Sequence, residues 1–161
     1  MAVLKVLAYG NEILRTPSKE VHKISKKIHN LVQDMSDTMY AYNGVGLAAP
    51  QVGENLRIFV IDVSPENGPK DPIVFINPKI IKKSGAMIST EGCLSFPESY
   101  MDVRRYSSVT VKALGINNKP FVMKSTGNTI LTKVLQHEFD HLDGILFIDH
   151  TRNRFEADMI L

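Results

Sequence analysis

The stretch that decides the fold is residues 137–141, which read HEFDH and lie in a segment, 129–143, predicted to be helical. On a helix, residues four apart lie on one face, so the imidazoles of His137 and His141 can bind one metal ion. Glu138 lies beside that face, where it can act as a general acid/base on a water molecule. The sequence therefore predicts a metal-dependent amide hydrolase built around this helix.

A catalytic site of this type needs a third protein ligand. Position 147 is Phe, so the protease pattern HExxHxxGxxH is not completed. His150 could reach back only by a tight return, and Glu156 is the sole glutamate after the motif. Cys93 is the remaining strong candidate, although a lone cysteine is more often a small buried hydrophobe. The residues alone leave these alternatives open.

The rest of the chain predicts an α+β fold with mainly antiparallel sheets packed around the central HExxH-bearing helix. Residues 25–43 carry apolar side chains at helical spacing and predict an N-terminal amphipathic helix. The residues expected to form strands are 57–63, 73–76, a strand pair within 79–88 that turns at Ser84-Gly85, 108–114 and 121–123. No linker or repeat interrupts the chain, so we expect a single catalytic domain spanning 1–161.

Composition excludes several other classes of protein. The chain is 43% hydrophobic and 22% charged, and its net charge of +2 is too small to argue for a nucleic-acid or membrane partner, so no direct nucleic-acid site is evident. No apolar run approaches the roughly 20 residues that span a bilayer, and the first residues do not resemble a signal peptide. The single cysteine cannot form an internal disulfide. We therefore expect a cytoplasmic protein with no membrane partner.

Three segments together resemble the signature motifs of the peptide deformylases. Residues 44–51 (GVGLAAPQ) are similar to that family's GxGxAAxQ, residues 91–95 read EGCLS, and residues 136–144 (QHEFDHLDG) are similar to QHExDHLxG. Each motif alone is moderately specific, whereas the three in this order are highly specific. The resemblance covers the chain from about Val3 to Phe147 and is similar to the compact bacterial branch.

The resemblance implies removal of the formyl group from N-formyl-methionyl peptides and nascent proteins at the ribosome, with release of formate. It implies Fe²⁺ as the metal, with Zn²⁺, Ni²⁺ or Co²⁺ able to substitute. The ligands implied are Cys93, His137 and His141. The catalytic groups implied are Glu138 as acid/base, and Gln51 with the backbone N–H of Leu94 as oxyanion donors.

Substrate-binding residues are expected near the metal. The resemblance implies that Gly46 offers backbone hydrogen bonds to the substrate peptide. Val45, Ile130 and Val134 have suitable side chains for a methionine pocket, and the last two lie on the ligand face of the predicted helix. Ordinary core packing is the other interpretation of these three residues.

The sequence also departs from the family pattern. Tyr100 stands where many bacterial relatives carry an arginine that binds the substrate backbone. Arg105 is expected to pair with Glu91, and Lys133 replaces an often apolar residue near the pocket. Two other functions remain open from the residues: a small HExxH metallopeptidase, and a non-catalytic metal-binding protein whose site is closed by a fourth ligand such as His150.

Overall fold

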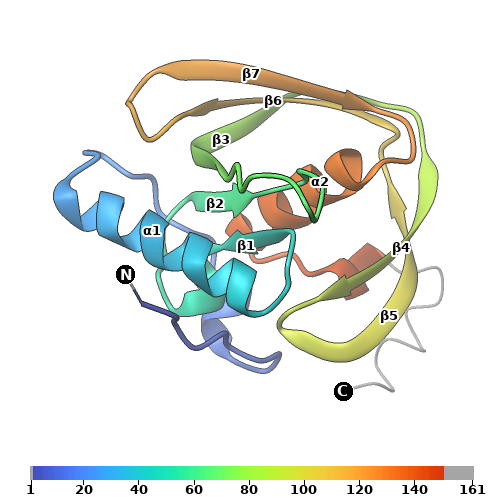
Figure 1. Cartoon of the computed structure of the whole chain (residues 1–161). Coiled ribbons are helices and arrows are strands. Elements are labelled where there is room, and N and C mark those ends of the chain that lie inside the picture. The colour runs from blue at the N-terminus through green and yellow to red at the C-terminus, as the bar shows by residue number, and fades with distance from the viewer. Residues whose placement is uncertain (1, 151–161) are drawn as a thin grey trace.

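The computed structural model describes residues 2–150 and shows two α-helices, seven strands and three short 3₁₀-helices (Figure 1). The helices are α1 (Lys26–Ala41), α2 (Ile130–Leu142), η1 (Glu12–Arg15), η2 (Ala49–Val52) and η3 (Phe147–His150). The strands are β1 (Gly46–Ala48), β2 (Ile58–Ile61), β3 (Ile73–Ser84), β4 (Met87–Cys93), β5 (Phe96–Arg105), β6 (Ser108–Leu114) and β7 (Pro120–Thr126).

Two antiparallel sheets organise these strands. Five strands form one sheet in the order β1-β2-β3-β6-β7, and β4 pairs with β5 in a separate two-stranded sheet. The α+β fold with antiparallel sheets around the HExxH helix is therefore confirmed. Among residues 2–150, no helix combines the length and the apolar character that a bilayer span requires.

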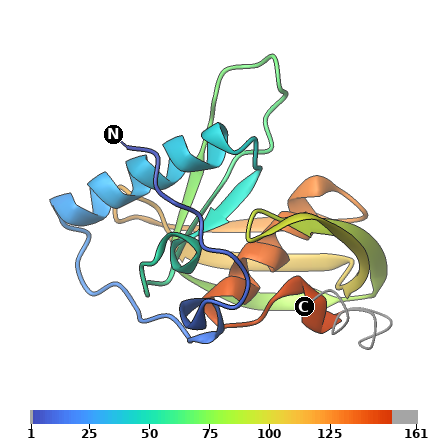
Figure 2. The same ribbon diagram turned by 90° about the horizontal axis from the view of Figure 1, so that it is seen from below.

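The two helices pack on opposite faces of the five-stranded sheet (Figures 1 and 2). Ile58 and Val60 of β2 pack in one apolar cluster with α1, whereas Phe59 and Ile61 pack in another with α2. Because side chains alternate along a strand, both faces of β2 must be apolar. This double burial explains the dense apolar run at residues 57–63.

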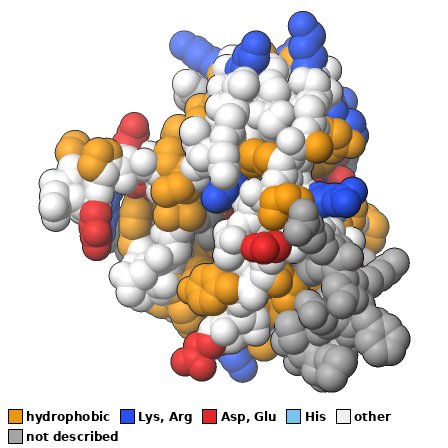
Figure 3. Space-filling view, turned by 90° about the vertical axis from the view of Figure 1, so that its right-hand side faces the viewer, with side chains coloured by type: hydrophobic (Ala, Val, Ile, Leu, Met, Phe, Trp, Pro, Cys, Tyr) orange, Lys and Arg blue, Asp and Glu red, His pale blue; other side chains and the backbone are white. Residues whose placement is uncertain are grey.

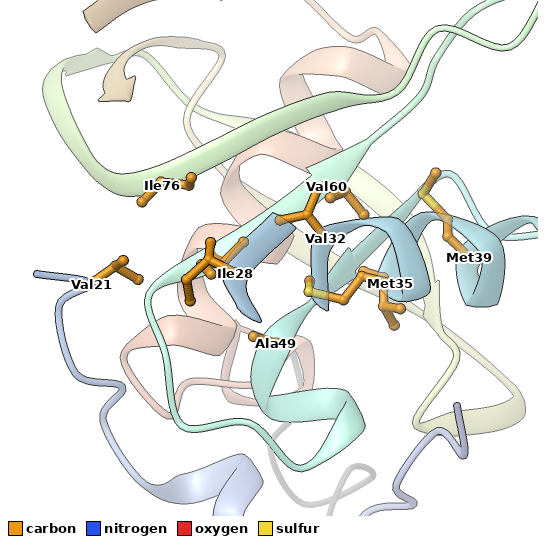
Figure 4. Close-up of a cluster of buried hydrophobic side chains, with 10 residues drawn as sticks. Val21, Ile28, Val32, Met35, Met39, Ala49, Val60 and Ile76 are labelled. Atoms are coloured by element: carbon orange, nitrogen blue, oxygen red, sulfur yellow. The ribbon is translucent and has the colours of Figure 1, made fainter. Parts of the chain in front are cut away.

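Helix α1 begins at Ser25, whose side chain accepts a hydrogen bond from the Ile28 N–H. Its buried apolar side chains sit over the sheet, as Figure 4 shows for Ile28, Val32, Met35 and Met39. The helix is followed by Asn43, which adopts a left-handed φ of 56°. It thereby delivers residues 44–48 to the edge of the sheet.

Strand β3 differs from the prediction, because it continues through Asn77-Pro78 rather than ending there. The pairing with β6 shifts register between Ile76 and Lys79, and Asn77 has a φ of 50°. The Asn77 side chain accepts from the Val21 N–H and donates to the Val21 carbonyl, each at 2.8 Å. A β-bulge held by these two hydrogen bonds thus accommodates Asn77-Pro78, so the strand continues where the sequence predicted its end.

The strand pair expected around Ser84-Gly85 is wrong. Gly85, with a φ of 69°, leads the chain out of the large sheet, so that β3 pairs with β6 while β4 pairs with β5. Strand β5 was not predicted, because its sequence FPESYMDVRR mixes charged and apolar residues without strict alternation. Strand β1 is also absent from the predicted strands, because it is short and rich in small residues.

Candidate active site

Helix α2 presents the HExxH residues to the interior. Thr129 caps the helix by accepting from the Thr132 N–H, and the following Gly144 has a φ of 72°. His137, Glu138 and His141 are all buried, with 8%, 3% and 1% of their surface exposed. The helical spacing therefore places both imidazoles and the carboxylate in one protected region, as the sequence predicted.

Cys93 reaches the same region from the end of β4. It pairs with Phe96 across a tight turn formed by Leu94 and Ser95. The ligand atoms of Cys93, His137 and His141 lie within 4.8 Å of one another, and Cys93 Sγ is 3.4 Å from His141 Nε2. One sulfur and two imidazole nitrogens form a donor set that suits Fe²⁺ or Zn²⁺. The tertiary fold thus brings the upstream cysteine to the two histidines.

The other residues considered for the third ligand are placed differently. His150 Nε2 lies 3.0 Å from Asp140 Oδ2 and is not part of the cluster. Glu156 lies outside the described residues. Within residues 2–150, the only group of three or more metal-type side chains is the one formed by Cys93, His137 and His141.

A chain of buried charges fixes the orientation of His137. Its Nδ1 lies 3.1 Å from Glu91 Oε1, and Arg105 donates to both oxygens of that carboxylate. Arg105 also donates to Asp140 Oδ2 at 2.6 Å. Burial raises the pKa of Glu91, but the bonds from Arg105 and His137 outweigh it and hold that pKa at about 2. Because Nδ1 is engaged, Nε2 of His137 is left for a metal.

Two buried polar atoms at the site have no hydrogen-bond partner among the described residues: Glu138 Oε2 and His141 Nδ1. Buried polar atoms in folded proteins are nearly always paired, so such atoms indicate a place for water or a ligand. Burial lowers the pKa of His141, which keeps its imidazole neutral and able to bind a cation. The residues present therefore fit a divalent metal ion.

Burial also raises the pKa of Glu138 to about 7, against the opposing charges of His137 and Arg105. A carboxylate with a pKa near neutrality can both accept and return a proton at physiological pH. The position of Glu138 beside the ligand cluster gives it the geometry for this exchange.

Gln51 extends from η2 into the site and is 1% exposed. Its Oε1 accepts from the Ala48 N–H at 2.9 Å, and its Nε2 donates to Ser95 Oγ at 3.2 Å and to Cys93 Sγ at 3.5 Å. The bond from Ala48 determines which end of the amide faces Cys93. Sequence reasoning missed Ser95 as a partner, although it lies in the EGCLS segment.

A cavity of about 630 Å³ opens beside these residues. It is lined by all four predicted substrate-binding residues and by Gln51, Cys93, Leu94, His137 and Glu138. Val134 is buried, whereas Val45 and Ile130 are 43% and 58% exposed to solvent. A Cβ atom at Gly46 would lie 2.6 Å from Val134 Cγ2 and 2.8 Å from Glu138 Oε1, so only glycine fits there.

The rim of the cavity includes Tyr100 and Lys133, whereas Arg105 does not line it. Tyr100 is 74% exposed and covers Gly92, where a Cβ would lie 2.7 Å from the ring. Arg105 is buried in its pair with Glu91, as expected from the sequence. Glu98 also lines the rim and has a φ of 61°, a left-handed conformation that sequence reasoning did not foresee.

Comparison with known proteins gives one consistent family. Residues 3–156 match the family model described as polypeptide deformylase. Peptide deformylase 1 of Clostridium perfringens is 46% identical over 150 residues, which cover 93% of this chain and 99% of that protein. The peptide deformylase of Pseudoalteromonas translucida is 48% identical over 150 residues, covering 93% and 87%.

Solved structures agree with the sequence comparison. The crystal structure of a peptide deformylase from Legionella pneumophila is similar with a TM-score of 0.91 and 42% identity, covering 99% of this chain and 91% of that one. A peptide deformylase from Synechococcus elongatus, solved in complex with actinonin, is similar with a TM-score of 0.89 and 39% identity, covering 98% and 84%.

Proposed function

The chain belongs to the peptide deformylase family, and we propose that its Cys93, His137 and His141 hold the metal ion on which this family's activity depends. The chain is accordingly a metal-dependent hydrolase that removes the formyl group from the N-terminal formyl-methionine of newly made proteins and releases formate. The single observation that carries the ligand assignment is the convergence of one sulfur and two imidazoles within 4.8 Å beside an unpaired carboxylate oxygen of Glu138.

Glu138 is proposed to move the proton in this reaction. A bound divalent cation supplies Lewis acidity, which polarises the formyl carbonyl and lowers the pKa of a water molecule. Oε2 of Glu138, which no other described residue engages, then accepts the water proton and returns it to the leaving amine. Burial excludes bulk water from Glu138 and so strengthens the electrostatic interactions of its carboxylate.

Gln51 and the backbone N–H of Leu94 are proposed to stabilise the oxyanion that develops on the formyl oxygen. The Ala48 N–H fixes the Gln51 amide so that Nε2 faces the ligand cluster. Preorganised donors of this kind act without reorganisation during the reaction, and the loss of one costs about 2.7–4 kcal/mol of transition-state stabilisation.

The cavity walls are proposed to bind the methionine side chain and the peptide that follows it. Val45, Ile130 and Val134 line the cavity together with Gly46 and provide apolar side chains there. Because Gly46 allows its backbone close to Val134 and Glu138, its peptide groups can bond to an extended substrate next to the reacting carbonyl.

We further propose Fe²⁺ as the native ion, since one thiolate and two imidazoles suit it, with Zn²⁺, Ni²⁺ or Co²⁺ able to occupy the same ligands. The substrate, a nascent chain, places the enzyme in the cytoplasm at the ribosome. The whole of residues 1–161 is proposed to act as one catalytic domain. The alternative of a closed four-ligand site loses its fourth candidate, because His150 bonds Asp140 instead.

The test is release of formate from formyl-Met-Ala-Ser by anaerobically purified, Fe²⁺-loaded protein. Stoichiometric formate is expected, together with no cleavage of Met-Ala-Ser, which carries no formyl group. Absence of formate from protein with bound iron would refute the proposed function. Hydrolysis of the unformylated peptide would instead indicate a general metallopeptidase.

A further inference from the structure

One face of the five-stranded sheet is only half covered. Helix α1 packs on this face at β2 and the start of β3, where Ile58, Ile76 and Leu114 join its apolar cluster. These three residues are paired across the strands and so mark the side of the sheet. Beyond them, the rest of β3, β6 and β7 continues on the same face without a helix above it (Figure 1).

Four lysines occupy this uncovered part, which we call the lysine face: Lys79, Lys82, Lys112 and Lys124. Lys112 and Leu114 are two residues apart on β6 and therefore share a side of the sheet. The register pairs Lys79 with Lys112, and it pairs both Lys82 and Lys124 with Thr110. All four are exposed, whereas Val109, Val111 and Ala113 of β6 point to the α2 side and are buried.

The charge on the lysine face is not neutralised within the sheet. Strands β3, β6 and β7 contain no aspartate or glutamate, and none of the four lysines forms an ion pair with a residue in 2–150. Glu20 shares a hollow with Lys79 but makes no ion pair with it. Like charges directly opposite, such as Lys79 and Lys112, destabilise a sheet. Protection of a sheet edge explains lysines on the edge strand β7 and on the part of β3 beyond its pairing with β2, but it does not explain Lys112, because β6 is an internal strand.

Hydroxyl groups accompany the lysines. A shallow hollow of about 430 Å³ on this face is lined by Lys82, Lys124, Ser84, Ser108 and Thr110, together with Ile81 and Lys83. In Figure 3, Lys and Arg side chains gather at the top of the molecule, with no Asp or Glu drawn among them there. Ammonium and hydroxyl donors side by side are the groups that proteins use against phosphate oxygens.

We propose that the lysine face binds the phosphate backbone of RNA and docks the protein on ribosomal RNA. This inference rests on the proposed function. If the substrate is a nascent chain, the enzyme encounters it at the ribosome, whose surface is made largely of RNA. A membrane fits less well, since the face is a sheet with only Val122 and Ile81 as exposed apolar side chains and the chain has no tryptophan. The net charge of +2 does not reveal this local positive charge, because acidic residues on other elements cancel it in the sum.

Docking by this face leaves the active site open. The cavity lies on the α2 side, lined by α2, β1 and the β4–β5 sheet, whereas the lysine face is on the other side of the large sheet. RNA held by the lysine face therefore does not cover Val45 or Ile130 at the cavity mouth. A nascent N-terminus can enter while the protein stays bound.

The test compares two variants that each lose four positive charges. One carries Lys79→Gln, Lys82→Gln, Lys112→Gln and Lys124→Gln on the lysine face. The matched control carries Lys5→Gln, Lys23→Gln, Lys26→Gln and Lys27→Gln, which are equally exposed but lie on other segments. Binding is measured by anisotropy with a labelled ribosomal RNA hairpin over a salt series, and by cosedimentation with purified ribosomes.

If the lysine face binds RNA, its variant loses most RNA affinity. The magnitude of the slope of log K against log salt also decreases by roughly 3, because each of the four lost phosphate contacts contributes about 0.7–0.9 to that slope. The control keeps most of its affinity, and it cosediments with ribosomes when the lysine-face variant does not. Equal binding by the two variants, or binding of wild-type protein to anionic phospholipid vesicles but not to RNA, overturns the proposal. Formate release from formyl-Met-Ala-Ser by the same preparations reports separately on the proposed function and is expected to be unchanged in both variants.

Discussion

The guanidinium of Arg105 holds both carboxylate oxygens of Glu91, with Nε 2.9 Å from Oε2 and Nη2 2.7 Å from Oε1. Both residues are buried, and the same carboxylate bonds Nδ1 of His137. The buried ion pair of Arg105 and Glu91 is thus hydrogen-bonded to His137, a proposed metal ligand. Stability and metal binding are therefore expected to change together when this pair is broken.

Arg105→Gln is expected to destabilise the protein by about 3–5 kcal/mol, because Glu91 is left buried without its counter-charge. Urea unfolding at neutral pH measures this change. Arg104→Gln is the matched control, since Arg104 is the exposed neighbour of Arg105 on β5. Similar free energies of unfolding for the two variants would show that the buried pair contributes little.

Cys93→Ala is expected to abolish tight metal binding, whereas His150→Ala is expected to retain it. The reason is that Cys93 Sγ belongs to the ligand cluster, while His150 bonds Asp140. Metal content after dialysis against a chelator measures the difference. Metal loss in the His150 variant alone would assign the third ligand to that residue instead.

Glu138→Gln is expected to keep metal and fold but to lose about 10²–10⁴-fold in turnover of formyl-Met-Ala-Ser. Glutamine has nearly the same shape, but its amide cannot accept and return the water proton. Formate release is measured on protein whose metal content is confirmed to equal that of wild type. Turnover within a few-fold of wild type would remove Glu138 from the acid/base role.

Val45→Ala and Ile130→Ala are expected to lower kcat/KM for formyl-methionyl peptides with little change in stability. Both side chains line the cavity and are partly exposed, so the substrate is expected to bury them. Each methylene removed is then expected to cost about 0.8 kcal/mol of binding, which lowers kcat/KM roughly fourfold. Val122→Ala is the control, because Val122 exposes 58% of its surface, as Ile130 does, but lies on the lysine side of the sheet. An equal kcat/KM in all three variants would contradict the methionine pocket.

Asp62→Asn is expected to reduce stability above pH 4 and to have a smaller effect near pH 2. Burial raises the pKa of Asp62, but bonds from Ser64, Tyr40 and the Asp71 N–H outweigh it and hold that pKa at about 2, below the ordinary 3.8. A lowered folded-state pKa contributes stability above the ordinary pKa, and this contribution is lost as the pH falls through the folded value.

The difference in Tm between wild type and the Asp62 variant should therefore shrink from pH 5 to pH 2. Glu66→Gln, an exposed change in the same loop, should show no such trend. A Tm difference that stays constant over this range would contradict the lowered pKa. The Asp62 N–H also bonds the Val45 carbonyl at 2.9 Å, so the same loop supports one wall of the cavity.

The sequence by itself determined the features that depend on local spacing. Residues four apart on a capped helix must share a face, so His137 and His141 were predicted together from their positions alone. The dense β-branched run at 57–63 likewise indicated a buried strand. The motif resemblance then supplied the family, which the comparisons confirm.

Only the tertiary structure decided which distant groups meet at the helix. Nothing local distinguishes Cys93 from a small buried hydrophobe, and its choice over His150 depends on the β4–β5 turn that places Sγ 3.4 Å from His141 Nε2. The β-bulge at Asn77 and the change of sheet at Gly85 depend on partners far along the chain. The periodicity of apolar residues in the sequence carries no information about such partners. The lysine face exists because strand register aligns β3, β6 and β7, whereas the net charge, a sum over all residues, carries no information about where charges gather.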